Sequence, residues 1–281
     1  MATSRRSGRS RERREVAAVR ALERGLSLLE TLARSPRLAL TALAQETGLP
    51  ASTAYRLLET MRRRGFVQYV PEAGVYQLGV RAFEVGNAFV QTLGLHEAAL
   101  PAMRRLVEEV NETVNLAVRD GAEAVYVGQV EGQHLVRMFT QIGTRAPLYC
   151  TGVGKALLAW ADPADVAALF RDGQPRAYTP RTITDPERLA AELERVRAAG
   201  FALDDEEREL GVRCIASPIR GRAGHVVAAL SLSAPASRLS DARVAELAPR
   251  VMATARAISY SLGWAGDPLP GDVPPPSSSV P

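Results

Sequence analysis

The chain has 281 residues, 46% of them hydrophobic and 23% charged, and a formal net charge of +4. This composition is that of a globular protein with ample core material, and the length suggests two domains. No apolar run reaches the ~18 residues that a membrane-spanning helix requires, and no hydrophobic stretch follows the arginine-rich N-terminus. We therefore expect a cytoplasmic protein without a membrane partner.

The cysteines and histidines point to no redox or metal chemistry. Cys150 and Cys214 lie far apart in a chain without a secretion signal, which argues against a disulfide framework and a four-ligand zinc site. His96, His134 and His225 do not show metal-ligand spacing. We therefore expect no bound metal and no cofactor.

Positive charge is concentrated at the N-terminal end. Residues 1–70 contain 14 arginines and no lysine against six glutamates, a net of +8, so residues 71–281 carry −4. Arginines supply the sequence-independent part of DNA affinity through phosphate contacts, so this asymmetry is typical of a DNA-binding module beside a mildly acidic domain. The arginine run within residues 1–15 is interpreted as a disordered, solubilising tail that can add non-specific DNA affinity.

A helical stripe of leucines over 16–33 predicts a supporting helix, and residues 41–63 contain two helical patterns separated by a Gly-Leu-Pro break. In the second pattern Ala54, Leu57, Leu58 and Met61 form a stripe that we expect to be buried. The opposite face is suited either to a DNA major groove or to solvent, as on any amphipathic surface helix. The predicted DNA-binding residues are Thr41, Ser52, Thr53, Tyr55, Arg56, Arg62 and Arg63.

The segment after this helix favours the DNA-binding interpretation. FVQYV and VYQL flank the turn-forming sequence Pro-Glu-Ala-Gly at 71–74, which predicts a β-hairpin. Three helices followed by a hairpin make a winged helix-turn-helix, which we place at residues 16–79. Residues 80–95 show a broad apolar helical stripe and are predicted to form a linker helix that contributes to dimerisation.

Residues 96–264 mix helices with antiparallel strands and predict an α+β domain, not a Rossmann enzyme. We expect helices at 97–111, 152–161, 163–171, 186–200 and 241–263, three consecutive strands at 113–119, 123–130 and 135–141, and a second hairpin from VRCIASPIR and HVVAALSLS. The Pro/Ser-rich segment 265–281 is expected to be disordered.

Seven motifs carry a resemblance to a known family over residues 16–264. They are GLPASTAYRLLETMRRRGFV (48–67), YQLG (76–79), NLAVRDG (115–121), APLYCTGVGKALLA (146–159), YTPRTITDP (178–186), LDDEERELGVRCIASPI (203–219) and AALSLSAPASRLS (228–240). In this order they resemble the IclR family of bacterial transcription regulators. The resemblance implies an N-terminal winged helix-turn-helix, a linker helix and a C-terminal GAF-like effector-binding domain, assembled as homodimers or as dimers of dimers.

The resemblance also implies a pocket for a small organic acid effector beside the sheet. The residues at matching positions are Thr151, Gly152, Val153, Gly154, Asp204, Cys214, Ser231 and Ser233. Thr151 is a plausible N-cap, and accessible N–H groups at Gly152 and Gly154 would favour an anion. From the strand pattern we add Tyr126 and Met138 as apolar lining. Each of these residues taken singly is more often a packing residue, and only their joint match to the family favours the pocket.

Two further patterns have plain explanations. GVGK at 152–155 is not a P-loop, because Tyr149 and Ala156 stand where a glycine and a hydroxyl are required. Lys155, the only lysine, is expected to pack or to form an ion pair near the helix start. The acidic residues 204–207 are interpreted as a solvated loop from which one residue reaches the pocket.

We therefore predict a ligand-responsive regulator, preferably a repressor, of a catabolic or metabolic operon, which binds double-stranded DNA at a palindromic operator. One alternative is an enzyme that uses Cys150 or Cys214 as nucleophile and His134 or His225 as base, although no local signature supports this pairing. The other is an architectural DNA-binding protein without a ligand, which the large C-terminal domain disfavours.

Overall fold

The computed structural model describes residues 19–92, 94–138, 140–171 and 173–266. By its internal contacts the chain divides into two compact units, Met1–Phe89 and Val90–Pro281, and each is described here by itself. The predicted tail at 1–15 and nearly all of the tail predicted at 265–281 lie outside the described residues. Within the described part of the chain, no helix is long and apolar enough to cross a membrane.

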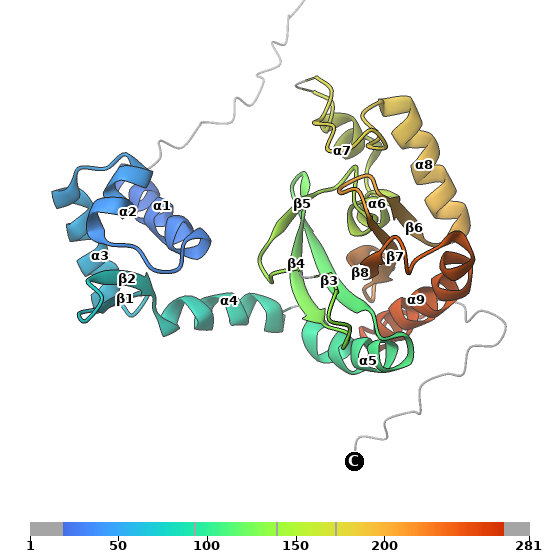
Figure 1. The fold of residues 1–281 in the computed structure, drawn as a ribbon, viewed down its shortest axis with the longest axis horizontal. Coiled ribbons are helices and arrows are strands. Elements are labelled where there is room, and N and C mark those ends of the chain that lie inside the picture. The colour runs from blue at the N-terminus through green and yellow to red at the C-terminus, as the bar shows by residue number, and fades with distance from the viewer. Residues whose placement is uncertain (1–18, 93, 139, 172, 267–281) are drawn as a thin grey trace, which may run out of the picture. The chain divides into compact units, whose positions relative to one another are not determined.

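The N-terminal unit consists of three helices and a two-stranded hairpin, coloured blue to teal in Figure 1. The elements are α1 Arg20–Arg34, α2 Leu40–Thr47, α3 Ala51–Arg63, β1 Val67–Val70 and β2 Val75–Leu78. Their shared core is built around the side chains of Leu28, Leu32, Leu43, Leu58 and Tyr76. The predicted winged helix-turn-helix is therefore present.

Local sequence explains the sharp turn between α2 and α3. Gly48 ends α2 in the left-handed region, at φ 64°, and Pro50 stands in extended conformation at the N-cap of α3. Glycine adopts a positive φ without steric cost, and the fixed φ of proline suits the beginning of a helix. The wing strands pair antiparallel from Val67 opposite Leu78 to Val70 opposite Val75.

Helix α1 buries only part of the leucine stripe expected from the sequence, which consisted of Leu22, Leu26, Leu29 and Leu32. Leu28 and Leu32 are buried, whereas Leu22 and Leu26 remain 61% and 48% exposed. The difference arises because α1 has leucines on two adjacent faces, and only contact with α2 and α3 determines which face is covered. Helix α4, Val80–Thr92, forms where the linker helix was predicted.

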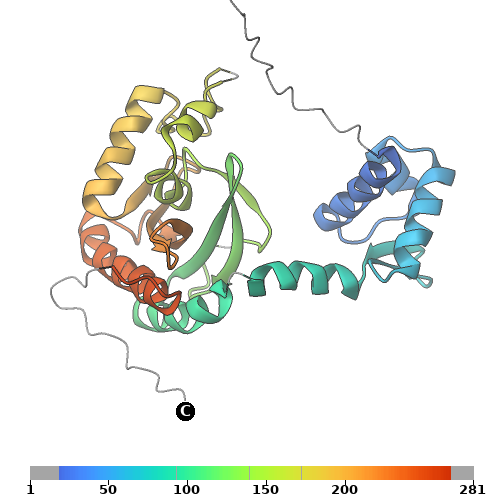
Figure 2. The ribbon, with the colours of Figure 1, turned by 180° about the vertical axis from the view of Figure 1, so that it is seen from behind.

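The C-terminal unit is a curled six-stranded antiparallel sheet covered by helices on both faces (Figures 1 and 2). Its strand order is β5-β4-β3-β8-β7-β6. The strands are β3 Thr113–Asp120, β4 Glu123–Val130, β5 Arg145–Pro147, β6 Ala202–Asp205, β7 Val212–Arg220 and β8 Val226–Pro235. The helices are α5 Leu95–Val110, α6 Gly152–Leu158, α7 Pro163–Ala168, α8 Pro186–Ala199 and α9 Asp241–Ser261.

Alternation along the strands directs side chains into two separate cores. On β3, Val114 and Leu116 pack with α5 and α9, whereas Ala117 faces the core formed with α6 and α8. The residues on this second face include Asn115 and Thr113, both fully or almost fully buried. The other side chains on this face are small, so there is room for a site between the sheet and α6 to which these polar groups can contribute.

The prediction of a strand at 135–141 is wrong, and β5 takes the place beside β4 instead. Leu135 and Val136 are 98% and 71% exposed, so their apolar character does not reflect burial in this unit. The backbone of this segment is bound by side chains in place of a strand ladder: the Val136 carbonyl accepts from Arg238, and the Met138 carbonyl accepts from the Thr113 hydroxyl. Strand β6 was not predicted, because half of it is aspartate.

Candidate functional site

The outer face of α3 presents the polar residues predicted to contact DNA. Ser52, Tyr55, Arg56, Arg62 and Arg63 are exposed. Thr53 is half-buried, and Thr41, on α2, is exposed. The opposite face buries Ala54 and Leu58 completely, with Leu57 and Met61 packed at the margin of the core. The structure therefore gathers the predicted α3 side chains on one accessible surface.

Arg56 and Arg62 on this face differ in whether the guanidinium already has an ion-pair partner. Arg62 forms a bidentate ion pair with Glu59, with Nε–Oε1 and Nη2–Oε2 distances of 2.9 and 2.8 Å. This pairing raises the pKa of Arg62 and lowers that of Glu59. Among the described residues Arg56 has no ion-pair partner. Arg56 is therefore available for a new hydrogen-bonding partner, whereas Arg62 must first separate from Glu59.

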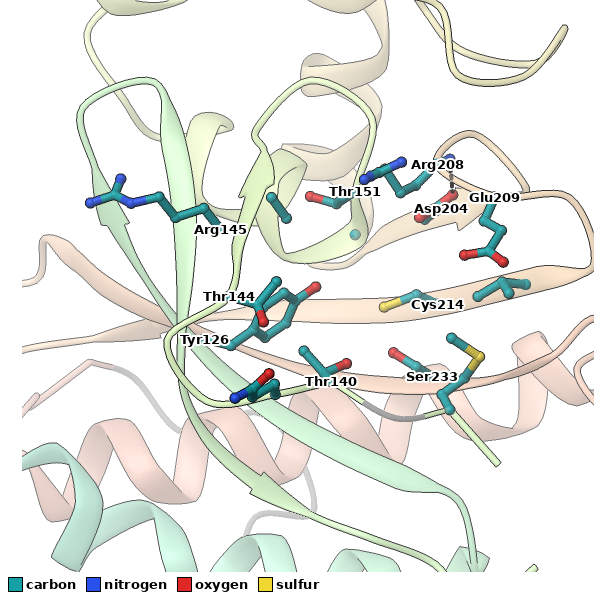
Figure 3. Close-up of a pocket in the computed structure, with 15 residues that line it drawn as sticks. Tyr126, Thr140, Thr144, Arg145, Thr151, Asp204, Arg208, Glu209, Cys214 and Ser233 are labelled. Atoms are coloured by element: carbon teal, nitrogen blue, oxygen red, sulfur yellow. Dashed lines mark hydrogen bonds between the residues drawn. The ribbon is translucent and has the colours of Figure 1, made fainter. Parts of the chain in front are cut away.

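A pocket of about 370 Å³ opens beside the sheet of the C-terminal unit (Figure 3). Its wall combines residues from β4, β6, β7, β8, the start of α6 and the segment before β5. Seven of the ten residues expected from the sequence line it, namely Tyr126, Met138, Thr151, Gly152, Asp204, Cys214 and Ser233. The sheet thus brings together positions that lie more than 100 residues apart in the chain.

Three of the expected residues do not line the pocket. Val153 is fully buried in the core between α6 and the sheet. Gly154 lies against the backbone of Leu148, where an added Cβ would approach the carbonyl oxygen to 2.2 Å. Ser231 is completely buried on β8, two residues before Ser233. The side chains of Val153 and Ser231 are therefore packed in the interior, and Gly154 permits close packing of α6 on the backbone of Leu148.

Helix α6 begins at the pocket with a well-formed cap. The Thr151 hydroxyl accepts a hydrogen bond from the Gly154 N–H at 3.1 Å and donates one to the Pro147 carbonyl at 2.8 Å. Gly152 packs closely on β7, because a Cβ there would lie 3.0 Å from Cys214 Sγ and 3.2 Å from the Cys214 carbonyl oxygen. The cap therefore fixes the pocket wall, and the Thr151 hydroxyl is already engaged.

The wall formed by the sheet carries small polar groups. Cys214 and Ser233 are direct neighbours in the β7–β8 pairing, and Ser233 also faces Thr113 of β3. The Asn115 amide donates to Ser233 Oγ at 3.4 Å, and Asn115 Oδ1 is buried without a hydrogen-bond partner among the described residues. A polar ligand would find donors and acceptors at this wall, since buried polar groups are normally satisfied.

The acidic residues 204–207 do not form a solvated loop, because Asp204 and Glu207 are 4% and 5% exposed and the other two are half-buried. One of them, Asp204, lines the pocket as expected. Lys155, only 1% exposed, contacts the Glu207 carboxylate and the Leu203 carbonyl, and its Nζ lies 3.0 Å from Glu192 Oε1. The predicted ion pair of Lys155 is thus confirmed. The sequence could not show that this lysine on α6 meets one acid of the turn after β6 and one acid of α8.

Burial also changes the ionisation of the acid that lines the pocket. It raises the pKa of Asp204 to about 7, with a further increase from the charge of Glu207, and the backbone N–H groups of residues 207 and 208 oppose it. Burial likewise raises the pKa of Glu207, against the effect of Lys155. Asp204 can therefore be neutral or charged near neutral pH.

The arginines near the pocket have different orientations. The Arg145 guanidinium points away from the pocket in Figure 3 and forms ion pairs with Asp120 and Glu123. The Arg208 guanidinium lies at the pocket mouth, 3.9 Å from the ring centroid of Tyr178, and has no ion-pair partner among the described residues. Only Arg208 offers an uncompensated positive charge to the described pocket lining.

The thiols are poor nucleophiles. Burial raises the pKa of Cys150 to about 12 and that of Cys214 to about 11, so both remain protonated at neutral pH. The phenol of Tyr126 also has a raised pKa because of burial and of the nearby Cys214 and Asp204. In the described part of the chain, no cluster of histidine, cysteine and acidic residues is arranged to hold a metal ion. The pocket is therefore suited to binding and not to covalent chemistry.

Eight further residues line the pocket that sequence reasoning missed: Thr140, Gln141, Thr144, Arg145, Ala146, Arg208, Glu209 and Val212. Half of them lie in the segment taken for a strand or in the turn after the acidic cluster, and the others belong to β5, to the segment before it or to β7. Arg208 and Glu209 could have been predicted from their position in the chain, because they follow the acidic cluster in the turn between β6 and β7, two strands that both reach the pocket.

Comparison with known proteins decides the family. Residues 87–260 match the family model described as "Bacterial transcriptional regulator IclR C-terminal", and residues 21–71 match the IclR helix-turn-helix domain. The chain belongs to the IclR family of bacterial transcriptional regulators. It is a DNA-binding regulator of transcription, and the enzyme alternative is not supported, since its relatives are named as regulators and repressors.

Similar proteins cover nearly the whole folded chain. The HTH-type transcriptional regulator BhcR of Paracoccus denitrificans is 40% identical over 87% of this chain and 88% of its own length. The transcriptional repressor IclR of Escherichia coli is 42% identical over 87% of this chain and 90% of its own. The crystal structure of an IclR homolog from Microbacterium hydrocarbonoxydans complexed with 4-hydroxybenzoate has a TM-score of 0.78 and 29% identity, covering 86% of this chain and 98% of that one. The α+β fold and the helix-turn-helix are thereby confirmed.

Proposed function

We propose that this IclR-family regulator is a repressor of a catabolic or metabolic operon and that a small organic acid controls it. The observation that carries the proposal is the pocket of about 370 Å³, whose wall combines hydroxyl, thiol and carboxyl groups with apolar Tyr126 and Met138. Such a mixture of apolar lining and a few convergent polar groups is typical of a small-molecule site. The homologue complexed with 4-hydroxybenzoate supports an organic acid as ligand.

Residues at the pocket surface are assigned to effector contacts, and Val153, Gly154 and Ser231 support the wall from behind. In the bound state, Ser233 and Asp204 would hydrogen-bond the polar part of the acid, while Tyr126 and Met138 cover its apolar part. The hydroxyl of Thr151 keeps its cap, so the start of α6 contributes shape and backbone.

The DNA contacts are assigned to the exposed face of α3. Arg56, with Ser52 and Tyr55, is placed to reach base edges, and Arg63 to reach phosphates, as the docking of a recognition helix in the major groove implies. Thr41, Thr53 and Arg62 complete the proposed contact set.

A palindromic operator requires two copies of this face, so we propose a homodimer, which can pair into a dimer of dimers. Helix α4 supports this assembly, because its residues Val80, Phe83 and Val85 are 72%, 72% and 57% exposed. Exposed aliphatic and aromatic side chains of this kind mark a protein contact. Effector binding would then change the spacing of the paired winged helices.

Thermal melting with a panel of organic acids that includes 4-hydroxybenzoate tests the effector. An acid present at a hundredfold excess over its Kd should stabilise the protein by about 2.7 kcal/mol. Ser233→Val should remove this gain, and Ser237→Val, an exposed serine outside the pocket, should keep it. If no acid in the panel raises the melting temperature, the effector assignment is wrong.

Binding to DNA from the region upstream of its own gene tests the output. We expect sequence-selective binding that weakens steeply with salt and that the active acid releases. Equal affinity for upstream and random DNA would contradict operator recognition.

A further inference from the structure

A second cavity lies at the other end of β7. Its volume is about 120 Å³, and its lining includes Trp160, Ser217, Arg220, Met252 and Trp264, none of which lines the first pocket. The walls come from the segment after α6, the end of α8, β7, α9 and the segment after α9. We call it the Arg220 cavity.

Both tryptophans of the chain meet Arg220 in this cavity. The guanidinium carbon lies 4.9 Å from the ring centroid of Trp160 and 5.9 Å from that of Trp264. The Trp264 ring is itself held by stacking on Tyr260, with centroids 5.6 Å apart. Aromatic faces within about 6 Å attract a cation through the ring quadrupole, so the position of Arg220 is well defined.

The edge of this guanidinium keeps unused donors. Nη1 donates to the Gly224 carbonyl at 2.8 Å. No hydrogen bond from Nε or Nη2 is made to any described residue, and no described acid forms an ion pair with Arg220. Arginine presents its donors in a planar fork that fits a carboxylate with two parallel hydrogen bonds. One side of the fork is therefore free to take such a group.

The electrostatic environment favours an anion. Burial lowers the pKa of Arg220, and no carboxylate of the described residues opposes this effect. Arg256 also lines the cavity. A partly desolvated cation without a counter-charge is costly, and an anion bound beside it would remove part of that cost. A monocarboxylate matches the single free edge of the Arg220 guanidinium.

We infer that the Arg220 cavity is a second ligand site of this regulator, which takes a small monocarboxylate on the free edge of the Arg220 guanidinium. Its volume equals that of roughly four water molecules in the liquid, which limits the ligand to acids of about acetate or lactate size. This site is separate from the proposed effector pocket and would let a second acid stabilise the same domain. Two sources supply such a group: a free acid, and the carboxylates of Asp267 and Asp272 later in the chain.

Tryptophan fluorescence of the full chain tests the inference, because both tryptophans line this cavity and the other pocket contains none. At constant ionic strength, acetate should change the emission saturably, and neutral acetamide should not. Arg220→Gln should weaken the acetate response by about tenfold or more, since it removes a charge-assisted bidentate contact. Arg222→Gln, a neighbouring exposed arginine outside the lining, should respond like the parent protein.

Further experiments identify the source of the carboxylate and test whether the Arg220→Gln variant is folded. A chain that ends at Gly266 should bind acetate at least as tightly as the full chain. If only the shortened chain responds, the occupant is a carboxylate of residues 267–281 and the inference holds with that source. Thermal melting and operator binding confirm that Arg220→Gln is folded. If neither chain responds to acetate, or if folded Arg220→Gln responds like the parent, the inference is overturned; either result leaves the proposed effector pocket untouched.

Discussion

Replacement of Lys155 by methionine should destabilise the C-terminal unit strongly. Lys155 is 1% exposed and its ammonium contacts Glu207 and Glu192, while Glu207 is itself only 5% exposed. Methionine preserves much of the side-chain length and removes the charge, which leaves Glu207 without its buried partner. Loss of one partner of a buried ion pair costs about 3–5 kcal/mol. At about 2–4 °C per kcal/mol, the melting temperature of this unit should fall by roughly 6–20 °C.

The size of this loss should depend on pH. Lys155 lowers the pKa of Glu207, and burial raises it. Without Lys155 the pKa of Glu207 rises further, so the carboxyl is more readily neutral in acid and the deficit should grow as pH rises. Calorimetry of both proteins from acidic to mildly alkaline pH measures the difference.

A second substitution provides the control. Glu207→Gln in the Lys155→Met background removes the orphaned charge and should recover part of the lost stability. The reasoning is refuted if Lys155→Met lowers the melting temperature by less than about 2 °C at alkaline pH, a change equivalent to ~1 kcal/mol or less. It is also refuted if the double variant is less stable than Lys155→Met alone.

Three further outcomes are expected. Because the pKa of Asp204 is raised to about 7, its carboxyl becomes charged as the pH rises through about 7, and the affinity of the protein for an organic acid should then fall. Calorimetric titrations should show this pH dependence for the parent protein and not for Asp204→Asn. In fluorescence anisotropy with operator and random DNA, Arg56→Ala should weaken specific binding by about 1–3 kcal/mol, and Arg62→Ala should weaken it less, because the Arg62 guanidinium is already paired. Equal losses on both DNAs would mark Arg56 as a phosphate contact. In urea unfolding, Gly154→Ala should destabilise the protein by roughly 1–3 kcal/mol, because the added Cβ clashes with the Leu148 backbone, whereas Gly25→Ala, on an open helix face, should stabilise it by ~0.5–1 kcal/mol. Equal effects of the two substitutions would contradict the packing argument.

Elements with a strong local signal were predictable from the sequence. The period of Ala54, Leu57, Leu58 and Met61 predicted α3, and the turn sequence at 71–74 predicted the wing. Both depend on interactions within a few residues, which a local pattern records directly. The same holds for the hairpin of β7 and β8.

The errors occurred where distant segments decide the outcome. Residues 135–141 have the apolar content of a strand, yet Leu135 and Val136 are exposed, and the side chains of Arg238 and Thr113 bind the carbonyls of Val136 and Met138. Conversely, ALDD at 202–205 is polar by sequence and forms an edge strand because β7 pairs with it. The composition of a short segment does not reveal which other segment it will pair with.

The sequence by itself determined the winged helix, the α+β character of the second unit and seven of the fifteen residues that line the pocket, because periodicity and motif spacing carry them. Only the tertiary structure decided the electrostatics. It placed Lys155 against Glu207 and Glu192, buried Asp204 so that its pKa rises to about 7, and brought Trp160, Arg220 and Trp264 to one cavity. Charge and burial depend on which side chains meet across the sheet, and residues separated by dozens of positions meet only when the chain has folded.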